Sequence, residues 1–323
     1  MMKTFIQPWR APLAMLAVTL SCVAGAGAEE LTIGYAVPSL SQSFWISSAY
    51  GAQDEASKEG VKLIKLSAGG DGNVAQQISQ LQSLIQRRVG AIVVGATNGD
   101  AVRAVVDQAV RQGIAVIGIS SPPNSQHLTS IVTADHYDMG RMQAECLGEA
   151  LQGQGDVAML AGPAGQAWSD LRAEGFRQTL KDKFPGINVV AQSRLADNRN
   201  ASLNTTEDWL QRFANLKGIY SATEDMAAGA VAALRASGRL EQVKVSTSNF
   251  SPTTRELLAN NEVVCSSVQQ VVEQGRSALR LAVAAAHKQR VEKVVSLPAL
   301  KISPQDVATI NLDQVMAPAS YTP

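Results

Sequence analysis

Residues 31–70 read LTIGYAVPSLSQSFWISSAYGAQDEASKEGVKLIKLSAGG, and this stretch decides the fold. The apolar run 31–37 predicts a buried strand, and residues 43–58 predict a helix that Gly60 ends. A second apolar run, 61–67, predicts another strand. A strand, a helix and a second strand in this order form a βαβ unit, in which the two strands are parallel.

The same alternation continues along the chain and then starts again near residue 130. A helical face repeats at Val74, Ile78, Leu81 and Ile85, and another helix is expected at 101–112. After the restart, helices are expected at 137–151 and 169–182. Strands are expected at 91–95, 114–120, 130–135, 156–162, 187–193, 218–223, 243–248 and 263–268. The predicted fold class is therefore α/β, with two doubly wound parallel-sheet lobes that bind ligands beyond the carboxyl ends of the strands.

Composition and charge agree with a globular chain and exclude some partners. The 323 residues suffice for two domains, with 46% hydrophobic and 17% charged residues. Basic and acidic residues number 28 each, so no charge excess indicates a nucleic acid or a membrane surface as partner.

The first 28 residues have the order of a secretory signal. Lys3 and Arg10 precede an apolar run, and Ala26 and Ala28 occupy the small positions of a cleavage site. Cleavage after Ala28 leaves 26 basic and 28 acidic residues (28 − 2 and 28), a net charge of −2. We expect a soluble periplasmic protein that begins at Glu29. A signal anchor and a lipid-modified Cys22 are the alternatives.

Two cysteines remain after cleavage, Cys146 and Cys265. An oxidising compartment permits a disulfide between them. The interpretation favoured from sequence is nevertheless two buried free thiols. No C-x-x-C pair indicates zinc or thioredoxin chemistry.

Catalytic motifs are missing from the sequence. The histidines His127, His136 and His287 are scattered, and there is no H-E-x-x-H, no G-x-S-x-G and no phosphate-binding P-loop. The glycine-rich AGGDGN, 68–73, is interpreted as a strand-to-helix turn. DHYDMGR, 135–141, is interpreted as a helix start capped by Asp135 with the other polar groups solvated. We therefore expect no enzyme activity, no cofactor and no bound metal.

Aromatic residues mark the predicted ligand edge instead. Phe44 and Trp45 follow the first strand directly, and Trp168 lies in the loop GPAGQAWSD of the opposite lobe. At least one member of the pair is expected to contact a ligand, since two neighbours on a helix point in different directions. Tyr35, inside the first strand, is expected in the core.

Several stretches together resemble the type I periplasmic binding proteins of the ribose and galactose class. They are the opening stretch, NVAQQISQLQSLIQRRVGAIVVGATNGDAVRAVVDQAVRQGIAVIGI, GPAGQAWSDLRAEGFRQTL, SATEDMAAGAVAALRASG and VEQGRSALRLAVAAAHKQ. The resemblance runs from about residue 31 to about 300. It implies two lobes joined by three crossings, with a ligand closed between them. Within the class, PSL, FW, YG and AGG look most like the branch that contains the trimethylamine N-oxide sensor of bacterial respiratory regulation.

Matching the residues to sugar binders of this class keeps some contacts and loses others. Phe44 and Trp45 match the aromatic platform, and Gln269 matches the glutamine that follows the last strand before the crossing. Ser120 and Ser121 stand where sugar binders carry an Asp-Arg pair, so the charge-assisted grip on ring hydroxyls is missing. The ligand-binding residues implied in this way are Gln42, Phe44, Trp45, Ser120, Ser121, Trp168, Asp170, Asp197, Thr223, Asn249 and Gln269.

The function expected from sequence is capture of a small polar solute, such as a sugar or polyol, and its delivery to an ABC permease. The alternative is a sensor of a small methylated amine or amine oxide that signals through a membrane histidine kinase. We expect a monomer with an N-terminal lobe of 29–134 plus 270–302 and a C-terminal lobe of 135–269 plus 303–323. The hinge is expected near 134–135, 269–270 and Ser303.

Overall fold

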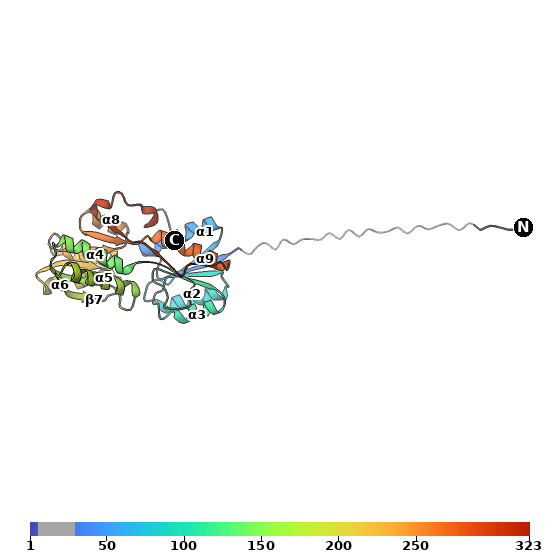
Figure 1. Ribbon diagram of the computed structural model, residues 1–323, viewed down its shortest axis with the longest axis horizontal. Coiled ribbons are helices and arrows are strands. Elements are labelled where there is room, and N and C mark those ends of the chain that lie inside the picture. Colours follow the sequence, from blue (N-terminus) through green and yellow to red (C-terminus); the bar gives the residue numbers. More distant parts are fainter. Residues whose placement is uncertain (6–29) are drawn as a thin grey trace. The chain divides into compact units, whose positions relative to one another are not determined.

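The computed structural model describes residues 1–5 and 30–323 of the chain (Figure 1). The predicted signal sequence and its cleavage site, like Cys22, lie almost wholly outside the described residues. Everything below concerns the compact unit formed by residues 31–323. None of the helices described is long and apolar enough to cross a membrane.

The first sheet of this unit is fully parallel, with the strand order β11-β5-β4-β3-β1-β2. Its strands are β1 (Thr32–Val37), β2 (Lys62–Ser67), β3 (Ala91–Val94), β4 (Ala115–Ile119), β5 (Ser130–Ala134) and β11 (Val294–Leu297). Ile33 and Tyr35 pack with α1 (Ser43–Glu59) and α9 (Val271–Ala286). Ala36 and Ile92 instead pack with α2 (Val74–Gln86) and α3 (Arg103–Arg111). Helices therefore cover both faces, which explains the continuous apolar strands.

The second sheet repeats this plan with the order β12-β10-β9-β8-β6-β7. Its strands are β6 (Gln154–Leu160), β7 (Gly186–Ser193), β8 (Leu216–Ser221), β9 (Lys244–Ser248), β10 (Cys265–Val268) and β12 (Leu300–Ile302). Its helices are α4 (His136–Ala150), α5 (Ala167–Lys183), α6 (Arg199–Arg212), α7 (Glu224–Ala236) and α8 (Pro252–Ala259). Only β12 runs antiparallel within this sheet of the described chain. The predicted α/β fold class with two parallel-sheet lobes is confirmed.

Glycines let one helix pair pack closely in each lobe. A Cβ on Gly51 of α1 would lie 1.9 Å from the carbonyl oxygen of Val272, and one on Gly140 of α4 would lie 2.0 Å from that of Arg172. Such contacts are impossible for any other residue, so the α1–α9 and α4–α5 pairs both depend on glycine. The same device in both lobes agrees with the repeat seen in the sequence.

Three chain segments connect the lobes, and one lies elsewhere than the sequence predicted. The first two run from β5 into α4 and from β10 into α9, at 134–136 and 268–271. The third joins β11 to β12 through Pro298 and Ala299 rather than lying at Ser303. Because β12 pairs with β10 and Ile302 is buried in the second core, residues 300–302 belong to the second sheet.

The C-terminal segment also departs from the predicted division of the chain. Val315 is buried in the core of the second lobe. Two residues later, the backbone N–H of Ala317 donates to Ser47 Oγ of α1 at 3.0 Å. Tyr321 then stacks edge-on against Tyr50 of α1, with ring centroids 5.1 Å apart. The chain end therefore lies beside the first lobe, where Figure 1 places the C-terminus next to α1.

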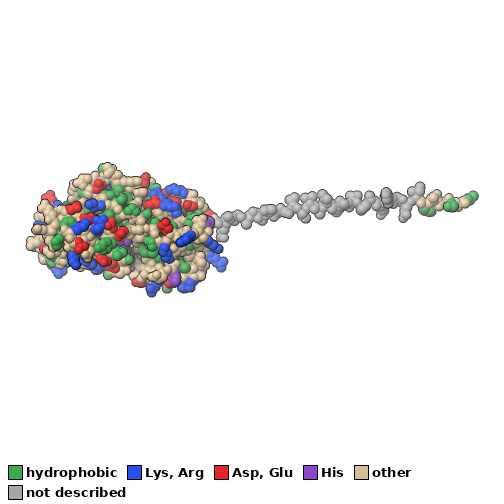
Figure 2. Space-filling model, viewed as in Figure 1, with side chains coloured by type: hydrophobic (Ala, Val, Ile, Leu, Met, Phe, Trp, Pro, Cys, Tyr) green, Lys and Arg blue, Asp and Glu red, His purple; other side chains and the backbone are tan. Residues whose placement is uncertain are grey.

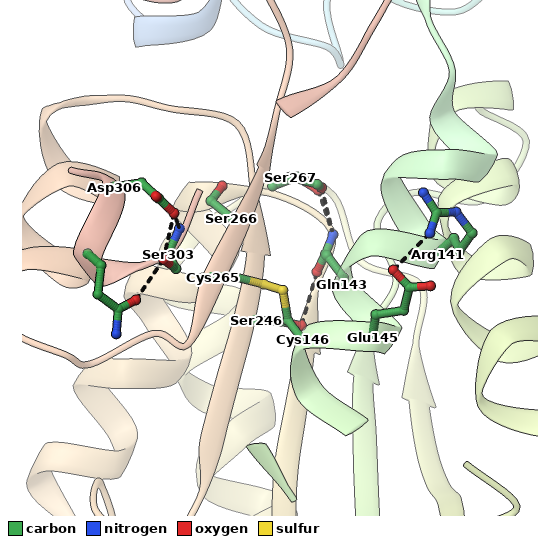
Figure 3. The surroundings of a disulfide bond; sticks show 12 residues. Arg141, Gln143, Glu145, Cys146, Ser246, Cys265, Ser266, Ser267, Ser303 and Asp306 are labelled. Carbon is green, nitrogen blue, oxygen red and sulfur yellow. Dashed lines mark hydrogen bonds and ion pairs between the residues drawn. A yellow bond between two sulfur atoms is a disulfide. The ribbon is translucent and has the colours of Figure 1, made fainter. Parts of the chain in front are cut away.

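The two cysteines are joined, so the prediction of free thiols is wrong. Cys146 of α4 and Cys265 of β10 form a disulfide across 119 residues of sequence (Figure 3). The helix α4 packs over β9 and β10, and this packing brings the two sulfur atoms together. Nothing in the local sequence around either cysteine indicated that contact.

Charges are dispersed over the surface that can be seen. On the face drawn in Figure 2, basic and acidic side chains are interspersed rather than gathered by sign. This distribution agrees with the balanced charge of the sequence.

Candidate binding site

A pocket lies between the two lobes, at the carboxyl ends of the strands of both sheets. Its empty volume is about 660 Å³, part of which is open to solvent. The lining residues are Gln42, Phe44, Trp45, Asp71, Ala96, Ser120, Ser121, His136, Pro163, Gln166, Trp168, Arg172, Asp197, Thr223, Glu224, Asp225, Asn249 and Gln269. Ten of the eleven residues predicted from sequence are among them; Asp170 is the exception.

Phe44 and Trp45 form an aromatic wall at the start of α1. Their rings meet edge to face with centroids 5.0 Å apart. Trp45 is only 6% exposed and belongs to the core of the first lobe, with its ring tip against Gly95. Trp45 therefore both lines the pocket and fills the core, while the sequence predicted only that at least one of the two rings contacts a ligand. Phe44 is the more accessible of the two.

Tyr35 lies in the core as expected and does not line the pocket. It is fully buried, and its hydroxyl donates to Ser48 Oγ at 2.7 Å. Burial raises its pKa above the ordinary value for tyrosine.

The opposite wall combines Trp168, Arg172 and His136. The Arg172 guanidinium lies over the Trp168 ring, 5.1 Å from its centroid, and donates from Nη1 to the carbonyl oxygen of Ala222 at 2.7 Å. Arg172 Nε also donates to His136 Nδ1 at 3.3 Å. Burial, together with the Arg172 charge, lowers the pKa of His136 to about 3. The imidazole is therefore neutral, so it can accept the hydrogen of Arg172.

Acidic side chains from the second lobe face the pocket. Thr223 caps α7 and donates through Oγ1 to Asp197 Oδ1 at 2.5 Å. Burial, and then the neighbouring Glu224, raise the pKa of Asp197 to about 8. Burial likewise raises the pKa of Glu224 to about 7 and that of Asp225 above its ordinary value. With Asp71 added, four carboxyl groups and one cation, Arg172, line the pocket.

Amides and hydroxyls complete the lining. Asn249 Nδ2 donates to Glu224 Oε2 at 2.8 Å, and Gln269 Nε2 donates to Asn249 Oδ1 at 3.0 Å. In the first lobe, Ser121 Oγ donates to the carbonyl oxygen of Ala96 at 3.1 Å. Gln42 precedes α1 and its side chain makes no capping bond. The pocket therefore offers both donors and acceptors next to flat apolar surfaces.

Asp170 does not line the pocket, which corrects its predicted role. It is exposed and forms an ion pair with Arg194. Trp168 and Arg172 are four residues apart on α5, so they share one face of the helix. Asp170 lies between them in sequence and points away from that face.

Sequence reasoning missed several lining residues. Arg172 lies two positions after the one where the sugar-binder pattern led us to look for a cation. His136 was interpreted as solvated, and Asp71 as part of an ordinary turn. Glu224 follows the matched position Thr223 directly. The residue types were visible, but which helix face turns inward decided the places of His136, Arg172 and Glu224. The path of the turn before α2 decided that of Asp71.

No group of three or more potential metal ligands among His, Cys, Asp and Glu occurs in the described part of the chain.

The fold and the pocket define a class: a two-lobed α/β protein with a pocket between the lobes. The chain belongs to the family described as periplasmic binding protein domain, whose model matches residues 33–290.

Relatives of known function share most of their length with this chain. It is 27% identical over 277 residues to the ribose import binding protein RbsB of Bacillus subtilis, covering 86% of this chain and 88% of the relative. It is 25% identical over 296 residues to the D-allose-binding periplasmic protein of Escherichia coli, covering 89% and 94%.

A solved structure has the same fold. The carbohydrate transporter solute binding protein of Agrobacterium radiobacter, in complex with D-arabinose, superposes with a TM-score of 0.83. The sequence identity is 26%, and the match covers 87% of this chain and 97% of the other. These proteins bind solutes for transport, so the chain is a binding protein rather than an enzyme.

Proposed function

We propose that this protein captures a sugar or polyol between its two lobes in the periplasm and delivers it to an ABC importer. The observation that carries the proposal is the pocket between the lobes. Aromatic rings face it from both sides, and Asn249, Gln269, Thr223 and Ser120 bring hydrogen-bonding groups to it. The activities of the two relatives, ribose import and D-allose binding, support the same class of ligand.

The lining chemistry suits a neutral ligand rich in hydroxyl groups. Aromatic faces pack against the C–H face of a sugar ring, while amides and carboxyl groups exchange hydrogen bonds with its hydroxyls. Arg172 is the one guanidinium in this lining and already donates to Ala222 and His136, so the pocket offers little cationic grip for an anionic ligand such as a sugar phosphate. We propose the ten lining residues predicted from sequence, together with Arg172 and Glu224, as ligand contacts.

Closure about the three crossings is the proposed mechanism of capture. The lobes that move are then residues 31–134 with 271–297, and 135–270 with 298–316. Gln166 Nε2 of the second lobe donates to the carbonyl oxygen of Thr97 of the first at 3.0 Å. Gln77 holds Thr97 in place by accepting from its N–H and its hydroxyl, at 2.8 and 2.9 Å. This contact across the cleft supports a closed form that a permease recognises.

The alternative function, sensing a trimethylamine N-oxide-like solute for a histidine kinase, is not supported by the relatives named above. Only the aromatic walls favour it, since aromatic faces attract N-methyl groups. The same screen tests both functions.

The proposal is tested by thermal unfolding with added solutes, because a ligand that binds only the folded state raises the melting temperature. The panel contains D-ribose, D-allose, D-arabinose and xylitol, with ribose 5-phosphate and trimethylamine N-oxide. At least one neutral sugar or polyol is expected to give a shift of several degrees at millimolar concentration, and ribose 5-phosphate none. A shift with trimethylamine N-oxide alone would favour the sensor.

Export is a separate part of the proposal. The mature chain is expected to begin at Glu29 and to be recovered in the periplasmic fraction. Intact-mass measurement of the secreted protein decides it. A mass that retains residues 1–28, or a lipid attached at Cys22, would contradict cleavage after Ala28.

A further inference from the structure

A continuous chain of side-chain hydrogen bonds runs from one lobe to the other beneath the pocket. Ser120 Oγ donates to Gln274 Oε1 at 2.5 Å, and Gln274 Nε2 donates to Gln269 Oε1 at 3.1 Å. Gln269 Nε2 donates to Asn249 Oδ1 at 3.0 Å, and Asn249 Nδ2 donates to Glu224 Oε2 at 2.8 Å. All five residues are at least nine-tenths buried.

Every bond in this chain points the same way, and the carboxylate at its end explains why. Above its pKa of about 7, Glu224 is an ionised carboxylate, which can only accept hydrogen bonds, so Asn249 must turn its NH₂ group toward it. Its oxygen then faces Gln269, which must donate in turn. The Gln269 oxygen then faces Gln274, which donates to it through Nε2. The Gln274 oxygen is left to accept, so Ser120 must donate its hydroxyl hydrogen to Gln274. Glu224 therefore orients side chains up to the far lobe.

Two members of this hydrogen-bond chain, one from each lobe, have matching backbone conformations. Ser120 follows β4 with φ 57°, and Asn249 follows β9 with φ 68°. Both are left-handed conformations that non-glycine residues seldom adopt, and such conformations concentrate at functional sites. The backbone N–H of Ser120 donates to Val132 O at 2.9 Å, and that of Asn249 to Ser267 O at 2.8 Å. Each strand end is thus fixed by the neighbouring strand.

We infer, building on the function proposed above, that Gln274 is a positioning residue that transmits the orientation set by Glu224 across the hinge to Ser120. Gln274 is fully buried and does not line the pocket, so it acts only through its neighbours. Ser120 gives its hydrogen to Gln274 and offers lone pairs to the pocket. It therefore accepts a hydrogen bond from a ligand hydroxyl.

The test is a set of isosteric substitutions read by thermal unfolding of the ligand-free protein at pH 8. In Gln274→Glu, the carboxylates at positions 224 and 274 both need hydrogen-bond donors. Asn249 and Gln269, which lie between them, must turn their NH₂ groups outward, so their two side-chain oxygens face each other. Its midpoint is expected to fall by roughly 5 °C, since a buried polar group is left without a hydrogen-bond partner. Adding Glu224→Gln leaves a single carboxylate in this hydrogen-bond chain, at position 274. The amides at positions 224, 249 and 269 can then all turn round and donate toward it. The double variant, with the net charge of the wild type, is expected to recover most of the loss.

A matched control is Gln143→Glu, another fully buried glutamine. Gln143 Nε2 donates to Ser248 Oγ at 2.6 Å. Its Oε1 accepts from Ser246 Oγ at 3.1 Å (Figure 3). Gln143 is not part of the hydrogen-bond chain that ends at Glu224. Glu224→Gln should therefore not relieve the loss of stability caused by Gln143→Glu.

Recovery in the double variant, or folding of the double variant where Gln274→Glu alone fails to fold, supports the inference. Equal loss from Gln274→Glu in both backgrounds, or failure of both to fold, overturns it. Because no ligand is added, a negative sugar screen would count against the proposed function and would leave this result unaffected.

Discussion

Phe44 and Trp45 are neighbours in sequence, yet they differ in how far each is buried in the core. Trp45 is 6% exposed and packs with the first-lobe core, whereas Phe44 is only partly buried and faces the pocket. A side chain that supports a core contributes to stability, while one that mainly covers a ligand contributes to affinity. The two residues therefore should respond differently to truncation.

Phe44→Ala is expected to weaken sugar binding about thirtyfold, because losing an aromatic anchor costs about 2 kcal/mol of binding. Its ligand-free melting temperature should change little. Trp45→Ala is expected to cost about 3–5 kcal/mol of folding free energy. Calorimetric titration and chemical denaturation of both variants measure this. Equal loss of stability in the two variants would contradict the division of roles.

The buried carboxyl groups predict a pH dependence of stability. The pKa of Asp197 is raised to about 8 and that of Glu224 to about 7 by burial, whereas both ionise near pH 4 in the unfolded chain. Between these values the unfolded state loses its protons first. These two groups should therefore lower ligand-free stability as the pH rises from 4 to 8. His136 acts the other way below about pH 6.5, because burial lowers its folded-state pKa to about 3, so the net fall is expected mainly above pH 6.5. The groups that act on Asp197 are Glu224, Thr223, Asp225 and Asp71.

Asp197→Asn removes part of this dependence. It should melt above the wild type at pH 8, and the difference should shrink toward pH 4. Thr223 can still donate to the amide oxygen of the variant, so the capping contact survives. Melting curves at pH 4, 6 and 8 measure the effect. A variant that melts below the wild type at pH 8 would show that the carboxylate is stabilised in the folded protein.

At the scale of elements, the α4–α5 pair positions the second wall of the pocket. Gly140 allows α4 to approach the backbone of Arg172, whose side chain bonds to His136 at the start of α4. Gly140→Ala is expected to destabilise the protein by about 1–3 kcal/mol, as overpacking does, and to weaken binding by displacing Arg172. Gly72→Ala, with nothing within 4 Å of the added Cβ, is the control. Equal stability of the two variants would exclude the close contact.

The disulfide ties α4 to β10 within the second lobe (Figure 3). Replacing both cysteines by alanine is expected to lower the free energy of unfolding by about 2–4 kcal/mol, because a cross-link restricts the unfolded chain. Denaturation with and without a reducing agent measures the difference. If the reductant has no effect on the wild type under unfolding conditions, the bond is not formed.

Hydrophobic periodicity predicts most helices and strands, because the pattern that defines each one is contained in a continuous stretch of sequence. The strand β1 and the helix α1 begin and end within about a residue of their expected positions. The short strands β11 and β12 gave no such signal, since β12 is defined by its pairing with β10. The contacts of Cys146, Asp170 and Tyr321 were beyond reach for the same reason. Each of these contacts depends on which distant segment of the chain, or which face of a helix, packs next to the residue.

For the whole molecule, the lobes are joined by three crossings, and the C-terminal segment adds a contact to α1 through Ala317 and Tyr321. Closure around a ligand would leave these contacts near the hinge and bring Gln166 to Thr97 at the cleft. Small-angle scattering should therefore show a more open ligand-free form that compacts when sugar is added.

The central claim is that one sugar or polyol binds between the lobes. Isothermal titration calorimetry with D-ribose, D-allose, D-arabinose and xylitol tests it most directly, alongside the double variant Phe44→Ala/Asn249→Ala. At least one of these solutes is expected to bind the wild type with one site per chain, and its affinity is expected to fall by more than about a hundredfold in the double variant. Binding of none of them, or undiminished affinity in a folded double variant, would contradict it.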